Sequence, residues 1–276
     1  MFKLKPMTSF SILLTLSCFF LQPANLFSQG IIRNLPTPGK WVRYEGRYEQ
    51  IEIHSQKNQA NVTTEWLRHI TIKCLGDEVQ ALYQGKTVPC QWIELKVITG
   101  KNVEGGLDAG PVGARVFRVL VPKSKVNPQV KDADGIRNAF LPIVKGYKKI
   151  GDGDVQQMKT KVLQIYPLIS NLMHYRKVQD EGKTEITVMG DSIPAKKQTG
   201  EMTMESKLYK TRNKAEMWVS DTIPFGLAKW KVKIERFSKG SVAPRSEFQP
   251  VTEITVEMEV REVGDEAESE IILPGE

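Results

Sequence analysis

The sequence predicts an α+β protein built on one mainly antiparallel, curved β-sheet, an open half-barrel with a central helical insert packed on one face. Most of the 276-residue chain alternates apolar and polar residues, which is the period of a β-strand. Residues from about 134 to 175 instead place apolar side chains at helical spacing. Alternation then resumes, and a strand, helix, strand order is typical of an α+β fold rather than of repeated βαβ units.

The segment 1–29 has the three regions of a secretory signal peptide. Two lysines precede an apolar run at 10–21, and a polar stretch with small residues follows. The run is shorter than the ~20 residues of a membrane-spanning helix, so we expect cleavage rather than retention as an anchor. Ser28 and Ala24 are alternatives for the last residue removed. The sequence therefore predicts an exported protein, periplasmic or secreted.

The three cysteines are interpreted in the light of export. Cys18 lies inside the apolar run, and because the run continues past it, lipidation at this residue is the less favoured interpretation. The mature chain then holds Cys74 and Cys90 in a compartment where disulfides persist. Two interpretations stay open. A disulfide between them would close a short loop and contribute about 3 kcal/mol, or both residues are buried free thiols.

Residues 30–263 are expected to form a single β-rich domain. Apolar and polar side chains alternate in four stretches of its first half, separated by glycine-containing turns. Strands are therefore predicted at 41–44, 66–73, 92–97 and 116–121.

The helical insert is predicted from two apolar stripes. The first consists of Ile136, Phe140, Ile143 and Tyr147, and the second of Val155, Met158, Val162, Ile165, Ile169 and Leu172. Both follow the three-to-four-residue spacing of one helix face. Pro142 and Pro167 interrupt the stretches, so short or kinked helices are expected.

The strands that follow the insert include the clearest pair. Trp230, Val232 and Ile234 alternate with lysines, whereas the apolar residues of 254–260 alternate with Glu253, Glu257 and Glu259 among others. If the two strands are neighbours, a lysine ladder faces a glutamate ladder, and each pair adds roughly 0.2–1 kcal/mol. Residues 264–276 show no periodic pattern and are predicted to be an acidic C-terminal tail.

Apolar residues of the insert suggest a ligand site. They are more numerous than two short helices need for one stripe, so they could line a cavity between helices and sheet. The alternative is that they form the core. The candidate ligand-binding residues are Phe140, Ile143, Met158, Ile165, Ile169 and Met173.

No cofactor or metal ion is expected. The histidines are isolated, and neither a Gly-x-Ser-x-Gly nor a His-Glu-x-x-His motif occurs. We therefore expect a non-enzymatic protein, with an enzyme of unknown class as an alternative.

The net charge and its distribution along the chain indicate possible partners. The chain has a net charge of +7, although residues 252–276 hold nine acidic residues and one arginine, so the rest is strongly basic. An exported basic body could contact an anionic envelope surface, and nucleic acid is not expected as a partner. The alternative to a ligand-binding protein is thus an envelope interaction or structural module.

Three short patches carry a resemblance. Met217–Trp230, with its Trp-x-Ser segment and Pro-x-Gly turn, resembles a segment of uncharacterised secreted bacterial proteins of planctomycete type, as do Trp41–Tyr44 and Cys90–Leu95. The element order is similar to the half-barrel of periplasmic lipoprotein carriers, whose concave face holds acyl chains. The resemblance implies a lipid or another apolar ligand between sheet and helices.

Overall fold

The computed structural model describes residues 30–54, 59–104, 106–126, 141–163, 169–173, 175 and 177–273. Nearly all of the regular structure in these ranges is antiparallel β-sheet. The strands are β1 (Trp41–Glu52), β2 (Val62–Tyr83), β3 (Lys86–Val103), β4 (Gly106–Asp108), β5 (Arg115–Pro122), β6 (Leu141–Pro142), β7 (Lys145–Ile150), β8 (Gln156–Gln157), β9 (Val162–Leu163), β10 (Lys177–Val188), β11 (Asp191–Glu205), β12 (Tyr209–Val219), β13 (Leu227–Ser238) and β14 (Gln249–Gly264). Short 3₁₀ turns occupy Gly110–Val112, Lys123–Lys125, Pro224–Gly226 and Arg245–Glu247.

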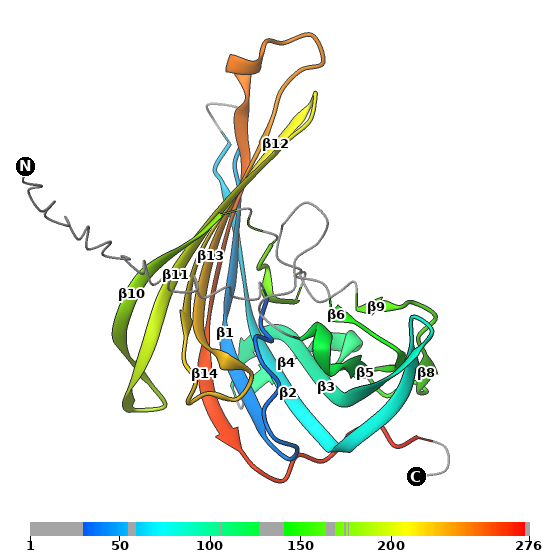
Figure 1. The fold of residues 1–276 in the computed structure, drawn as a ribbon. Coiled ribbons are helices and arrows are strands. Elements are labelled where there is room, and N and C mark those ends of the chain that lie inside the picture. Colours follow the sequence, from blue (N-terminus) through cyan, green and yellow to red (C-terminus); the bar gives the residue numbers. More distant parts are fainter. Residues whose placement is uncertain are drawn as a thin grey trace, which may run out of the picture.

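One large sheet dominates the molecule. Its twelve strands follow the order β10-β11-β12-β13-β14-β1-β2-β3-β5-β7-β8, with β4 added beside β3, and β6 pairs separately with β9. The last strand, β14, pairs with the first, β1, so the two halves of the chain join into one continuous sheet. Figure 1 shows the sheet curved and strongly twisted, with the ends of β12, β13 and the β1–β2 hairpin projecting as an arm beyond the rest.

The predicted central helical insert is wrong. In the described part of 134–175 the chain forms β6 to β9 and short irregular connections, and no extended helix occurs there. Pro142 lies in β6 and Gly146 in β7, and both residue types disfavour a helix interior. β7 pairs with β5 over six residues, so sheet pairing prevails over the local helical spacing. None of the described helical turns is long and apolar enough to cross a membrane.

The predicted pair of charged ladders is confirmed. β13 and β14 are antiparallel neighbours, with Lys229 opposite Glu259 and Lys231 opposite Glu257. Their charged atoms lie 3.4 and 2.5 Å apart, and Lys233 reaches diagonally to Glu253 at 3.0 Å. All these side chains are partly exposed, so each pair contributes only about 0.2–1 kcal/mol.

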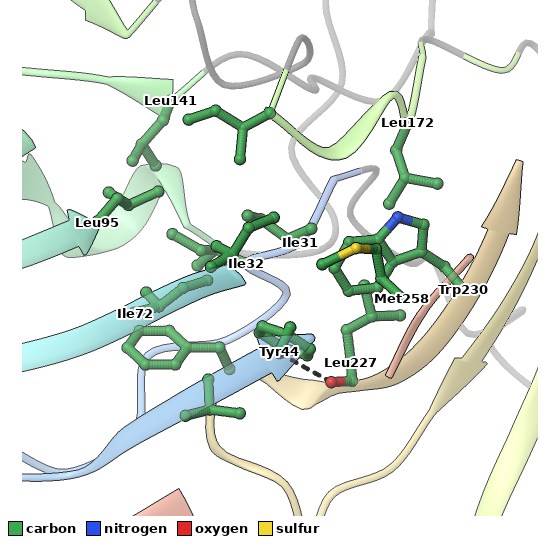
Figure 2. Packing of buried hydrophobic residues seen from close by; sticks show 14 of the residues in the cluster. Ile31, Ile32, Tyr44, Ile72, Leu95, Leu141, Leu172, Leu227, Trp230 and Met258 are labelled. Atoms are coloured by element: carbon green, nitrogen blue, oxygen red, sulfur yellow. Dashed lines mark hydrogen bonds between the residues drawn. The ribbon is translucent and has the colours of Figure 1, made fainter. Parts of the chain in front are cut away.

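The opposite side of the sheet, here called the inner face, carries the core. Figure 2 shows Ile31 and Ile32 lying between sheet residues and Leu141 and Leu172, which come from the segments above the sheet. The sheet residues that surround them and are drawn in the figure include Tyr44, Ile72, Leu95, Leu227, Trp230 and Met258. The phenol of Tyr44 is buried and donates a hydrogen bond to the carbonyl of Leu227 at 2.8 Å.

The acidic segment 265–273 lies on the outer face of the sheet. Glu94 of β3 is fully buried beneath it and accepts hydrogen bonds from the hydroxyl of Ser269 (2.6 Å) and the backbone N–H of Glu270 (3.1 Å). Arg118 of β5 donates to the carbonyl of Ile271 at 2.9 Å, and the Ile271 side chain is buried against the sheet. The described part of the predicted tail is therefore held against β3 and β5.

The two cysteines of the domain are free and buried, so the candidate disulfide does not form. Cys74 lies opposite Ile93 in the β2–β3 pair, and Ile93 is three residues along the strand from Cys90. Three residues of strand span about 10 Å, whereas the Cα atoms of a disulfide lie less than ~7 Å apart. The interpretation as two buried thiols is the one the strand register supports.

Candidate ligand-binding face

The inner face offers a continuous apolar floor. Rows of buried side chains cross it because residues paired between neighbouring strands point to the same side. One such row runs from Met217 of β12 through Trp230 of β13 to Met258 of β14. All three side chains are buried in the core cluster.

Segments from separate parts of the chain cover this floor. Ile31 and Ile32 precede β1, Leu141 and Leu163 belong to the β6–β9 pair, and Leu172 lies before β10. The N-terminal segment is fastened at Arg33, whose side chain donates to Gln198 Oε1 at 2.9 Å and whose backbone N–H donates to the carbonyl of Phe225. The cover thus consists of the short β6–β9 strand pair and of irregular segments.

The described residues of 169–175, here called the strap, are tied to the sheet through their backbone. Three side chains of the inner face donate to three successive carbonyls. Arg68 of β2 donates to Ile169 (2.9 Å), Trp230 of β13 to Ser170 (2.9 Å) and Asn213 of β12 to Asn171 (3.4 Å). Because the donors stand on strands from both halves of the chain, the strap extends across the middle of the sheet.

Tyr175 fixes the end of the strap. Its hydroxyl donates to Asn213 Oδ1 at 2.5 Å, and burial raises the pKa of the phenol well above its usual range. The ring lies against Gly200 of β11, where an added Cβ would stand 2.7 Å from Tyr175 Cγ. A glycine is therefore required at this position for the ring to reach the sheet.

Beyond the strap the inner face continues toward the projecting arm with less cover. Tyr48 of β1 and Trp66 of β2 are directly paired across the strands, with ring centroids 5.2 Å apart. Both are only partly buried, and Tyr48 packs against the edge of the core. The guanidinium of Arg68 lies 5.6 Å from the centre of the Tyr48 ring. This open part of the face, defined by Tyr48, Trp66 and Arg68, is here called the rim.

The residues predicted to bind a ligand lie in the cover, not at the rim. Ile143 and Ile169 are buried in the core, and Met158 and Met173 are half-buried against it. Phe140 and Ile165 lie outside the described residues. The four described side chains thus share one region above the floor, where they serve as core.

Sequence reasoning missed the rim, although a signal for it exists. Arg68, Arg115 and Arg236 each occupy a position of the apolar alternation in their strand. Arg68 is in phase with Ile70 and Ile72, and Arg236 with Val232 and Ile234. A charged residue at an apolar position of an alternating strand indicates a break in the core.

A hollow on the outer face is a less suitable site. It measures about 620 Å³ and lies over β10 to β13. Its lysines have acidic partners: Lys231 pairs with Glu257 at 2.5 Å, and Lys233 with Glu253 at 3.0 Å. The charges of this wall are already neutralised, and its lining offers few apolar side chains to a ligand.

In the part of the chain that the structure describes, no three His, Cys, Asp or Glu side chains are grouped so that they could hold a metal ion. Comparison with known protein families and with curated proteins finds no match for this chain. The geometry of the inner face is therefore the feature that bears on function.

Proposed function

We propose that this protein is an exported, non-enzymatic binding protein that holds an amphipathic ligand on the inner face of its sheet. The observation that carries the proposal is the rim, where the apolar floor continues from the closed core into the half-exposed surface of Tyr48 and Trp66. Apolar pockets with a few placed polar groups are the usual form of a small-molecule site.

The way the strap is attached supports the proposal. The sheet holds it through backbone carbonyls, by hydrogen bonds from Arg68, Trp230 and Asn213. Each such bond contributes about 0.5–1.5 kcal/mol net, or up to ~3 kcal/mol where the donor is charged. A ligand chain that replaces apolar side chains above the floor therefore competes with a small number of moderate contacts.

Export is proposed from the leader alone. Cleavage after Ala24 or Ser28 would leave Ile31 and Ile32, which are buried in the core, on the mature chain. N-terminal sequencing of the protein recovered from its host's envelope or medium tests this proposal, and a chain that still begins at Met1 contradicts it.

Ligand binding is tested with N-phenyl-1-naphthylamine, a neutral apolar fluorophore that brightens when bound. We expect Trp66→Ala to weaken binding about tenfold, because losing one large apolar contact costs on the order of 1–2 kcal/mol. Trp218→Ala is the matched control. Trp218 lies on the outer face, with Lys197 and Lys229 above its ring at 5.4 and 5.9 Å. Equal loss in both variants, or no binding by the unmodified protein, contradicts the proposal.

A second candidate function, contact with an anionic envelope surface, is favoured by the projecting arm. Val242, in the loop between β13 and β14, is 98% exposed, and Tyr209 at the start of β12 is 65% exposed. Lys207 lies in the turn just before Tyr209, and Lys239 lies in the loop that also holds Val242. An exposed aliphatic side chain among cations is the composition that binds a membrane surface.

A further inference from the structure

One row of side chains on the outer face holds the C-terminal segment 265–273. In this row Lys73 of β2 is paired with Glu94 of β3. Glu94 is paired in turn with Arg118 of β5, and Arg118 with Tyr147 of β7. Because paired residues point to the same side of a sheet, the four side chains stand in line across four strands. This row and the residues beside it that touch the segment are here called the docking surface.

The docking surface binds the main chain of the segment. The carboxylate of Glu94 accepts hydrogen bonds from the backbone N–H groups of Glu270 (3.1 Å) and Ile271 (3.4 Å). The guanidinium of Arg118 donates to the carbonyl of Ile271 at 2.9 Å. Main-chain hydrogen bonds of this kind hold an extended peptide on a sheet protein, whichever molecule the peptide belongs to.

Side chains of the segment alternate between buried and exposed. Ile271 is 0% and Leu273 is 8% exposed, whereas Ile272 between them is 76% exposed. The residues that the two buried side chains pack against are Val116, Trp92 and Tyr147. Alternate side chains in apolar contacts, combined with main-chain hydrogen bonds, are the usual basis of specificity for an extended peptide.

Charge also matches the segment to the docking surface. The carboxylate of Glu270 lies 3.1 Å from the ammonium of Lys73 and 2.8 Å from that of Lys96. Lys73 also donates to the carbonyl of Glu268 at 2.9 Å. The docking surface thus selects an acidic segment with two aliphatic anchors.

The turn that leads into the segment is short and strained. Glu266 has a φ of +61°, in the left-handed region that residues with a side chain rarely adopt. The turn is held by hydrogen bonds from Trp41 Nε1 to the carbonyl of Asp265 (3.0 Å) and from the N–H of Ala267 to the carbonyl of Gly39 (2.8 Å). Short hinges under strain favour the exchange of a terminal segment between copies, because an extended hinge relieves the strain.

We infer that copies of this protein exchange their C-terminal segments, so that the docking surface of one copy holds residues 265–273 of another. The contacts are the same in the exchanged form, because both copies carry the same surface and the same segment. The extended segment reaches about 30 Å from the end of β14. Within one chain it competes at an effective concentration on the order of millimolar, so the unmodified protein exchanges only when it is concentrated.

The experiment mixes two complementary variants of the mature chain. Ile271→Asp keeps the docking surface and loses an anchor of the segment, whereas Glu94→Gln keeps the segment and loses the carboxylate that binds it. We expect each variant alone to sediment as a monomer in analytical ultracentrifugation. An equimolar mixture should form mainly a one-to-one heterodimer at ~100 µM, with a Kd on the order of 10 µM.

Ile272→Asp is the matched control for Ile271→Asp, because it adds the same charge at the exposed neighbouring position. Its segment stays on its own docking surface, so its mixture with Glu94→Gln should remain monomeric. Circular dichroism shows whether each variant is folded. Leu273→Asp removes the other buried anchor and replaces Ile271→Asp if that variant does not fold.

A fluorescein-labelled peptide of residues 265–273, titrated into Ile271→Asp, separates recognition from exchange. Peptide binding without a heterodimer overturns the exchange between copies. If neither the peptide nor Glu94→Gln binds, the segment is held only as part of its own chain and the docking surface itself is refuted. A heterodimer that also forms with Ile272→Asp places the contact elsewhere on the molecule and overturns the inference.

Discussion

Glu94 illustrates how one buried carboxylate fixes a whole segment. It accepts hydrogen bonds from Ser269 and from the backbone of Glu270 and Ile271, and the ammonium of Lys73 lies 3.3 Å away. A buried charge is tolerated only when it is paired and hydrogen-bonded in this way. The carboxylate therefore determines where the segment after β14 lies.

We expect Glu94→Gln to release the segment 269–273. The amide cannot accept the same set of hydrogen bonds and leaves Lys73 without its buried partner, which costs about 1–3 kcal/mol. Hydrogen exchange should show faster exchange at Glu270 and Ile271, whereas β1 stays protected. Glu262→Gln, an exposed carboxylate on β14, is the control. Unchanged protection of the segment in the Glu94 variant would contradict the assigned role.

Cys74 and Cys90 are buried thiols of low reactivity. Burial raises the pKa of Cys74 to about 11 and also raises that of Cys90. Both thiols are thus protonated near neutral pH and poor nucleophiles. Their burial, together with the strand register, makes them core residues rather than a covalent link.

At the scale of elements, the junction between β1 and β14 joins the two halves of the sheet. Gly46 makes this close approach possible, because a Cβ there would lie 1.9 Å from the carbonyl oxygen of Glu257. That atom belongs to the backbone and cannot turn aside as a side chain would. The pairing of the halves therefore depends on a residue without a side chain.

Gly46→Ala should destabilise the protein by about 1–3 kcal/mol or more, since β1 must move away from β14. Gly240→Ala is the control, because a Cβ there would make only an ordinary 3.7 Å contact with Ala243. The free energy of unfolding in urea measures both. A Gly46 variant as stable as the control would contradict the close contact between β1 and β14 at this residue.

The covering segments are the elements whose structure the sequence pattern predicted least well. Ile143, Met158 and Ile169 have helical spacing, yet each reaches the floor from a separate short piece of chain. Such segments touch the sheet through a few side chains and need no regular period. The strap adds contacts through its carbonyls, which no side-chain pattern records.

In the whole molecule, the sheet extends beyond the part whose inner face is covered by the core. The arm formed by β12, β13 and the β1–β2 hairpin extends beyond the covered part (Figure 1). Its uncovered inner surface begins at the rim, and its end carries the exposed Val242. The proposed ligand face and the proposed surface contact are therefore separate regions that separate variants can test.

Contact of the arm with a membrane predicts sedimentation with vesicles of phosphatidylglycerol and phosphatidylcholine at low salt, weakening as salt screens the charges. Val242→Asp should reduce the bound fraction severalfold, because a charge replaces the apolar anchor. Ile272→Asp is the matched control, since Ile272 is 76% exposed but lies on the outer-face segment. Binding that is indifferent to salt, or lost equally in the control, would contradict this function.

The sequence by itself determined the antiparallel strands and the facing charges of β13 and β14. Side chains alternate along a strand, so the pattern of Trp230 to Ile234 contains its own local geometry. Only the tertiary structure decided that the chain between residues 141 and 163 forms strands rather than helices. It also decided that Glu94 is buried beneath the C-terminal segment and that Arg68, Arg115 and Arg236 lie on one face of the sheet. Those outcomes depend on contacts between residues far apart in the chain, whose free energy outweighs local preference and leaves no periodic trace in the sequence.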